Sequence, residues 1–208
     1  MSVHPTNRVA RLYERTARSY DRSMRLFDKL LFAGGREWVC SRAKGRVLEI
    51  AIGTGRNLEH YSKEVDLAGL EVSPAMLGHA RRRAVRSGLP VELLLGDAQS
   101  LPFAGQVFDT VVCTLGLCTI PDDLRALAEA SRALKAGGSL LLLEHVRSPI
   151  APVRWVQRAL EPLAVRFEGD HLTREPLEHL AGLSLEVEEC DRLKWGIVER
   201  VAARKIET

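Results

Sequence analysis

Short apolar runs alternate with stretches of helical spacing from Val47 to His145, and this alternation constrains the fold more than any other feature. The runs are rich in Leu and β-branched residues, which favour buried strands. We expect strands over 46–51, 66–71, 91–97, 108–114 and 138–145, and helices over 57–64, 74–87 and 122–134. Strands that alternate with helices are typical of a parallel sheet built from βαβ units.

The flanking segments complete this α/β fold. Apolar residues at helical spacing predict two or three helices over 7–41, and 183–190 with 195–205 predicts an antiparallel hairpin at one sheet edge. The expected architecture is a Rossmann-like, seven-stranded, mostly parallel sheet with helices on both faces. We expect one domain over 1–208, with an N-terminal helical cap over 1–44 and a lid-like insertion over 148–180.

Composition excludes several classes of protein. The net charge is +3 and the arginines are scattered, so a solvated mixed surface is expected rather than a nucleic-acid face. The four cysteines have no zinc-ligand spacing, which predicts reduced thiols, no metal site and a cytoplasmic location. No window approaches the ~20 apolar residues of a membrane span, and MSVHPTNR has no signal-peptide pattern.

The stretch VLEIAIGTGRN, residues 47–57, joins the first predicted strand to a turn that suits a nucleotide-like ligand. Gly53 and Gly55 let the backbone approach a ligand closely. Leu58 occupies the position of the third glycine in a dinucleotide fingerprint, which disfavours a dehydrogenase. Glu49, inside the strand, suits a cationic ligand better than a pyrophosphate.

Two further acids stand at the ends of the next two predicted strands. Glu71 is placed to accept the hydroxyls of a ribose, and Asp97 to accept from an adenine amino group. Each acid alone is more often an ordinary residue at a helix N-terminus. Together with Glu49 they indicate a ligand that contains a ribose, an adenine and a positive charge.

These motifs resemble those of class I S-adenosylmethionine-dependent methyltransferases, through VLEIAIGTGRN, LAGLEVSPAML, GDAQSLPFAGQVFDTVVC and RALKAGGSLLLLEH. The resemblance implies S-adenosyl-L-methionine as cofactor, S-adenosyl-L-homocysteine as product, and a tyrosine that closes over the amino-acid end of the cofactor. Ala51 replaces the first glycine of the family pattern, and we expect it to tighten the turn. The expected cofactor-binding residues are Tyr20, Glu49, Ala51, Gly53, Gly55, Asn57, Glu71, Val72, Met76, Asp97, Ala98 and Thr114.

The methyl acceptor is expected beside the ends of the fourth and fifth predicted strands. His145 ends a strongly apolar strand and is the candidate general base, although a structural histidine would look the same. Cys113 and Cys118 are expected to be small apolar pocket residues. The expected substrate-binding residues are Tyr13, Leu115, Leu117, Cys118, His171 and Arg174.

A narrower resemblance rests on GTGRNLEHY, VVCTLGLCTIPD and GDHLTREPLEHL. These are similar to the branch that contains alkyl thiol methyltransferases and bacterial phospholipid N-methyltransferase relatives. The resemblance implies a small thiol or lipid-like amine as acceptor, with His171, Thr173 and Arg174 over its pocket. A helix N-terminus set by Thr173 and Pro176 would explain the same sequence without a role in substrate binding.

Residues 150–167 form an amphipathic segment that we interpret as a mobile lid over an apolar acceptor. A peripheral membrane contact, a dimer face and a core helix are alternatives. The sequence thus predicts a methyltransferase, monomeric or homodimeric, acting on a small apolar acceptor. A quinone or natural-product C- or O-methyltransferase and a non-catalytic S-adenosylmethionine-binding protein remain alternatives.

Overall fold

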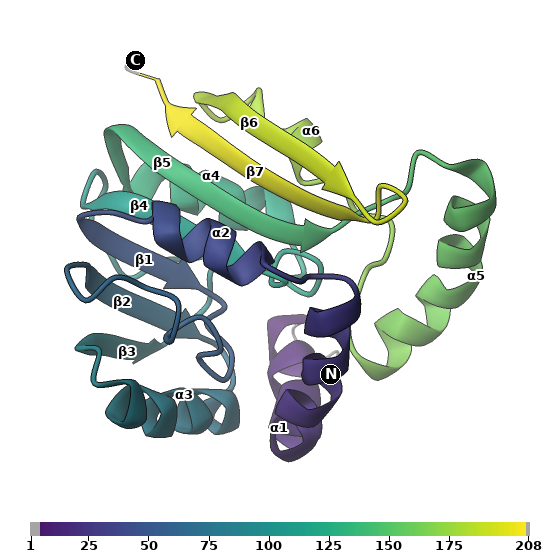
Figure 1. Ribbon diagram of the computed structural model, residues 1–208, viewed down its shortest axis with the longest axis horizontal. Helices are drawn as coiled ribbons and strands as arrows, with labels where there is room; N and C mark the ends of the chain where they lie inside the picture. The colour runs from purple at the N-terminus through teal and green to yellow at the C-terminus, as the bar shows by residue number, and fades with distance from the viewer. Residues whose placement is uncertain (1–4, 207–208) are drawn as a thin grey trace.

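The computed structural model describes residues 5–206 and contains one seven-stranded sheet (Figure 1). The strands run in the order β3-β2-β1-β4-β5-β7-β6. The first five strands in this order are parallel, and β7 pairs antiparallel with both β5 and β6. This confirms the predicted Rossmann-like sheet with its antiparallel pair at one edge. The strands are β1 Arg46–Ile50, β2 Asp66–Glu71, β3 Val91–Leu95, β4 Phe108–Thr114, β5 Leu134–His145, β6 Leu185–Leu193 and β7 Val198–Lys205.

Helices cover both faces of the sheet, as expected. In Figure 1, α2 crosses in front of the strands and α4 lies behind them, while α1 and α5 lie beside the carboxyl ends of the parallel strands. The helices are α1 Pro5–Leu30, α2 Gly35–Arg42, α3 Pro74–Ser87, α4 Asp123–Ala133, α5 Ala151–Phe167 and α6 Leu177–Leu180. No helix within residues 5–206 combines the length and apolarity needed to cross a bilayer.

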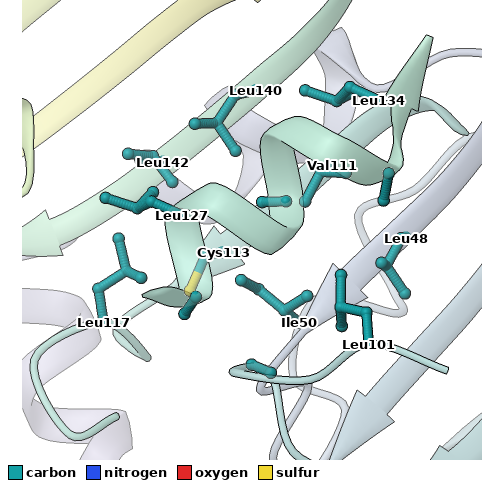
Figure 2. Packing of buried hydrophobic residues seen from close by; sticks show 14 of the residues in the cluster. Leu48, Ile50, Leu101, Val111, Cys113, Leu117, Leu127, Leu134, Leu140 and Leu142 are labelled. Atoms are coloured by element: carbon teal, nitrogen blue, oxygen red, sulfur yellow. The ribbon is translucent and has the colours of Figure 1, made fainter. Parts of the chain in front are cut away.

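The core forms two layers because successive strand side chains point to opposite faces. Val111, Leu140 and Leu142 pack under α4, where Leu127 lies over them (Figure 2). Leu141 and Leu143 belong to the other layer, which α2 covers with Val39 and Cys40. The sheet is therefore buried on both faces, which explains the continuous apolar runs in its sequence.

Helix boundaries follow the capping residues of the sequence. The Ser73 hydroxyl accepts from the Met76 amide at the start of α3, Pro74 is the first helical residue, and Gly88 ends the helix with φ +62°. Asp122 caps α4 by accepting from the Arg125 amide at 2.9 Å. Strand β5 begins at Leu134, directly after α4 and earlier than predicted, because Leu134 pairs with Phe108.

The predicted helix over 57–64 was wrong. The chain after β1 makes successive tight turns, such as Leu58 N to Gly55 O at 3.1 Å and His60 N to Asn57 O at 2.9 Å. The Asn57 side chain is drawn inward to Glu49 and Thr114, each at 2.9 Å. Because this polar anchor holds the turns, the glycine loop does not end at a helix N-terminus.

The two segments expected to lie outside the sheet differ from each other. Of the cap predicted over 1–44, only α1 lies at the carboxyl edge, because α2 packs on the sheet through Val39 and Cys40. Residues 1–4 and 207–208 lie outside the described part of the chain. Helix α5 has no buried residue. The core-helix alternative for 150–167 is therefore wrong.

Candidate functional site

A cavity lined by two acids opens at the carboxyl edge of the sheet, between β1 and β4, where the strand order reverses. Open α/β sheets bind their ligands at this switch point. Glu71 from the end of β2 and Asp97 beyond β3 lie on one side of the acid-lined cavity, and α1 covers it. The lining includes Thr6, Val9, Tyr13, Tyr20, Ala51, Gly53, Glu71, Val72, Met76, Asp97, Ala98, Leu115, Gly116 and Thr119.

Glu71 joins the two loops that form the floor of this cavity. Its carboxylate accepts from the Gly53 amide at 3.0 Å and from the Ser73 amide at 2.9 Å. Burial raises the pKa of Glu71, although these amide hydrogen bonds oppose the shift. A carboxylate oxygen has more than one lone pair, so Glu71 can accept ligand hydroxyls while keeping both amides.

Asp97 occupies the other end of the acid-lined cavity. Its carboxylate accepts from the Gln99 amide at 2.9 Å and from the Thr6 hydroxyl at 3.0 Å, and Gln99 Nε2 lies 2.8 Å away. Thr6 belongs to α1, so the first turn of this helix covers the end where an adenine is expected. Ala98 follows Asp97 in the lining with only a methyl group.

The two glycines of the loop have different roles. A Cβ at Gly53 would meet nothing nearer than the Ala51 carbonyl at 3.9 Å, so open space lies over this residue. A Cβ at Gly55 would lie 2.8 Å from Leu58 and 3.2 Å from Ala80, so this glycine lets α3 pack closely. Gly53 therefore leaves room for a ligand, whereas Gly55 serves packing and lies outside the cavity lining.

Glu49 lies beneath the glycine loop rather than in the cavity lining. It accepts from Asn57 at 2.9 Å and from the Tyr61 hydroxyl at 2.8 Å, and Asn57 in turn donates to Thr114. Arg36 reaches the Asn57 amide oxygen at 2.9 Å. Burial raises the pKa of Glu49 to about 7. This buried network shapes the loop from its buried side.

A second, apolar cavity of about 290 Å³ adjoins the first, between α1 and α5. Met24 and Phe27 line it from α1, Leu31 lines it directly after that helix, and Gln157 and Ala164 line it from α5. The polar groups in its wall are few, as is usual where a cavity takes an apolar ligand. The other lining residues are Tyr13, Tyr20, Phe32, Leu115, Cys118, Thr119, His145, Glu168, Asp170, Leu172 and Ile197.

His145 and Asp170 form a hydrogen-bonded pair in the wall of the apolar cavity. His145 Nε2 lies 2.9 Å from Asp170 Oδ1, and no partner is present for Nδ1 among the described residues. Burial opposes the charged imidazolium, but Asp170 outweighs it and raises the pKa of His145. Burial also opposes the Asp170 carboxylate, whose pKa the contact with His145 nevertheless lowers.

Cys118 completes a trio with this pair, since one donor atom from each residue lies within 4.8 Å of the others. Such a trio can hold a metal ion, and zinc is the ion that Cys, His and Asp suit. Ligands on one tetrahedral zinc stand about 3.3 Å apart or more, given the usual zinc–ligand distances. The 2.9 Å contact is shorter, so we assign a hydrogen-bonded dyad.

Three predicted substrate residues lie outside both cavity linings. The Arg174 guanidinium donates to the carbonyls of Leu117, Ile120 and Pro121, and so ties the segment after α5 to the loop after β4. The His171 amide donates to the Cys118 carbonyl at 2.9 Å. Leu117 is buried in the core. These contacts position the walls of the apolar cavity.

Glu144 supports the same loop from below. One carboxylate oxygen accepts from the amides of Gly116 and Leu117 at 2.9 and 3.0 Å, while the other is buried without a partner among the described residues. Burial raises the pKa of Glu144. The loop that separates the two cavities is thereby held from its buried side.

The two cavities share four lining residues: Tyr13, Tyr20, Leu115 and Thr119. The two tyrosine rings pack edge to face with centroids 6.0 Å apart. Leu115 and Ala51, both in the acid-lined cavity, have φ +53°, a conformation that is strained for side-chain-bearing residues and that clusters at functional sites. These four residues therefore form the boundary between the two cavities.

Most of the predicted residues come together here. The acid-lined cavity contains eight of the predicted cofactor residues, and Glu49, Gly55, Asn57 and Thr114 lie behind it. Sequence reasoning missed Asp170, Thr6, Val9, Gln157 and Ala164 as residues that line the two cavities. The helical spacing of Met24, Phe27 and Leu31 was visible, but not that they face a cavity.

Residues 48–142 match a family described as "Methyltransferase domain". A phosphatidylethanolamine N-methyltransferase of Cereibacter sphaeroides is 37% identical over 127 residues, 60% of this chain and 61% of that protein. A ubiquinone/menaquinone biosynthesis C-methyltransferase UbiE of Bordetella parapertussis is 41% identical over 113 residues, 51% and 44% of the two chains. The matches thus span about half to three-fifths of these curated relatives.

The fold agrees with that match. A geranyl diphosphate C-methyltransferase of Streptomyces coelicolor, solved with S-adenosyl-L-homocysteine, superposes with a TM-score of 0.74 at 15% identity, over 99% of this chain and 100% of that one. The class defined by the fold and the acid-lined cavity is that of class I S-adenosylmethionine-dependent methyltransferases. Residues 48–142, just under half of the chain, match the methyltransferase domain family, in agreement with this class.

Proposed function

We propose that this protein transfers the methyl group of S-adenosylmethionine to a small apolar acceptor, with a thiol or lipid-like amine favoured. The observation that carries the proposal is the pair of adjoining cavities, one lined by Glu71 and Asp97 and the other apolar with His145 in its wall. Their shared boundary at Tyr13, Tyr20, Leu115 and Thr119 is where a donor and an acceptor would meet.

The residues of the acid-lined cavity suit the cofactor. Glu71 would accept from the ribose hydroxyls, Asp97 and Ala98 would hold the adenine, and the open space over Gly53 would take the methionyl part. Tyr20 would close the far end of that part. When bound, the cofactor supplies an electrophilic methyl group on a sulfonium, and the protein supplies alignment and exclusion of water.

His145 is the candidate base for the acceptor proton. With Nε2–H donated to Asp170, the Nδ1 lone pair is left to accept a proton from a ligand in the apolar cavity. Asp170 would fix this tautomer and stabilise the imidazolium that forms, and it raises the pKa of His145, which makes the imidazole a stronger base. An amine or a thiol must lose such a proton.

A C- or O-methyltransferase acting on a quinone-like ring is the second candidate. The similarity to UbiE proteins supports it, and a ring acceptor would also need a base such as His145. A non-catalytic cofactor-binding protein would have a closed acceptor side, and the apolar cavity of about 290 Å³ argues against it.

Two measurements test the proposal. In calorimetric titrations S-adenosylhomocysteine should bind the wild type, and Glu71→Ala should weaken binding by at least about tenfold, the loss of a charged hydrogen-bond acceptor. Glu92→Ala, at an exposed carboxylate on the next strand, is the matched control. Absence of binding by the wild type would remove the proposed activity.

The acceptor class is separated by an acceptor panel. The protein is incubated with S-adenosylmethionine and alkyl thiols, amine-headed phospholipids or reduced quinones, and release of S-adenosylhomocysteine is followed. Turnover of thiols or lipid amines supports the first candidate, and turnover of quinols alone supports the second. Cofactor binding with no turnover across the whole panel would contradict both.

A further inference from the structure

Helix α5 exposes an apolar side that no part of the described chain covers. Val156, Leu160, Leu163 and Phe167 recur at spacings of four, three and four, which places them on one side of the helix. They are 50–63% exposed, and α5 projects from the molecule in Figure 1. Single exposed apolar residues are common, whereas a continuous row marks an interaction surface.

The end of α1 presents a similar surface on the opposite side of the apolar cavity. Leu26, Phe27 and Leu30 are 49–61% exposed, and Phe27 also lines the cavity. On α5, Ala164 lines the cavity next to the exposed Leu163. We call the seven residues of the two helices the apolar rim: Leu26, Phe27, Leu30, Val156, Leu160, Leu163 and Phe167.

Exposed cations accompany the apolar rim on both helices. Arg22, Arg25 and Lys29 are exposed on α1, and Arg158 and Arg166 on α5. Several nearby acids are already paired: Asp21 with Arg83, Asp28 with Arg56, and Glu161 with the Thr173 hydroxyl. Glu168 is an exposed acid at the end of α5. The rim is therefore apolar with a basic border, the pattern of surfaces that lie in an anionic membrane interface.

We propose that the apolar rim docks on the surface of an anionic lipid bilayer, with the mouth of the apolar cavity facing the lipid. The apolar side chains would enter the boundary between headgroups and acyl chains, and the cations would lie among the phosphates. An apolar acceptor would then pass from the bilayer into the cavity without crossing water. The docking itself does not depend on which acceptor is methylated.

A second copy of the chain fits this surface less well. A two-fold symmetric interface places each patch against its own copy. The basic border of one rim would then face the basic border of the other, and the cavity mouth would be closed. Charge complementarity therefore favours the lipid surface.

Sedimentation with lipid vesicles tests the proposal. The wild-type protein should bind vesicles of phosphatidylcholine mixed with phosphatidylglycerol, bind phosphatidylcholine alone less, and release as salt increases. The double variant Leu160→Glu with Leu163→Glu should bind vesicles at least about tenfold more weakly. Burial of even one Leu side chain in the bilayer strengthens binding by more than about tenfold. Val85→Glu with Leu124→Glu, at exposed apolar positions on α3 and α4, is the matched control and should bind as the wild type does.

A second pair of changes tests the basic border. Arg25→Gln with Lys29→Gln should reduce binding to the anionic vesicles by about fivefold for each charge and leave binding to phosphatidylcholine unchanged. Retained S-adenosylhomocysteine binding verifies that each variant folds, because none of these residues lines the acid-lined cavity.

Three outcomes would overturn the proposal. One is failure of the folded wild type to bind anionic vesicles, and another is equal binding by the rim variant and its control. The third is a wild-type dimer that the rim variant converts to a monomer while vesicle binding stays unchanged, which would assign the rim to a second copy of the chain.

Discussion

Ala51 illustrates how one residue of the cofactor loop is accommodated by another. It has φ +53°, a conformation that costs an alanine about 1 kcal/mol. Its methyl group lies where a side chain at Gly116 would be, since a Cβ at Gly116 would stand 2.8 Å from Ala51 Cβ and 2.8 Å from Cys113 Sγ. The alanine in place of the family's first glycine thus requires a glycine on the neighbouring loop.

This pair leads to a stability prediction. Ala51→Gly should change the free energy of unfolding by less than about 1 kcal/mol, because relief of the positive φ offsets the lost methyl contacts. Gly116→Ala should destabilise by about 1–3 kcal/mol through overpacking. The double variant should recover part of that loss in urea unfolding. Exact additivity of the two single changes would show that the residues are not in contact.

The dyad gives a prediction of pH dependence. Imidazolium cannot accept a proton, so kcat/KM should rise with pH through the pKa of His145, which lies above the usual histidine value. Asp170→Asn removes the group that raises this pKa, so the acidic limb should move to lower pH while the rate falls by at least about tenfold. His145→Ala should cost about 10²–10⁴ in rate. The measurement is the pH profile of methyl transfer.

The control for the dyad is Glu161→Gln, an acid of α5 that contacts His171 and Thr173 instead of His145. It should leave the acidic limb in place. An unshifted limb in Asp170→Asn would show that His145 is not the group that titrates.

At the scale of elements, α1 is held over the acid-lined cavity by acids seven residues apart. Glu14 accepts from the Ser73 hydroxyl at 3.2 Å and the Ala75 amide at 3.1 Å. Asp21 accepts from Thr54 at 2.6 Å and from Arg83 at 2.5 Å. Asp28 pairs with Arg56 and Arg36. The helix therefore contacts both loops that form the cavity floor.

Weakening these contacts should loosen α1. In Asp21→Asn with Asp28→Asn, hydrogen exchange and tryptic cleavage within α1 should increase, and S-adenosylhomocysteine affinity should fall by about three- to tenfold as Tyr20 loses its position. Glu64→Gln, an exposed acid beyond the glycine loop, should do neither. Unchanged hydrogen exchange in the double variant would show that apolar contacts, rather than these acids, keep α1 in place.

Elements with strong local signals could be predicted, and those that depend on distant partners could not. Ser73-Pro74 and Gly88 mark α3 in the sequence because capping is local. The turns after Gly55 have the apolar spacing of a helix, and only the buried bonds from Asn57 to Glu49 and Thr114 explain why no helix forms. Asp170 follows α5 with no periodic pattern, and its approach to His145 depends on the whole chain being folded.

At the scale of the whole molecule, ligand binding should be linked to folding. A ligand that occupies only the folded state stabilises it by about 2.7 kcal/mol at a hundred times its Kd. For a chain of this length, S-adenosylhomocysteine should then raise Tm by about 5–10 °C. Differential scanning calorimetry measures the shift, which Glu71→Ala should reduce by about half or more at the same ligand concentration. An equal shift in that variant would place the ligand elsewhere.

Strand β7 lies between β5 and β6 in the sheet although it follows both in the sequence. During synthesis on the ribosome, β5 therefore leaves the exit tunnel before its partner β7 is made. The edge of β5 that pairs with β7 stays open while α5, α6 and β6 are made. An open edge of this kind can pair with other nascent chains. Completion of the sheet must wait for Val198–Lys205, so a ribosome stalled before this strand would carry an aggregation-prone intermediate rather than a nearly finished enzyme.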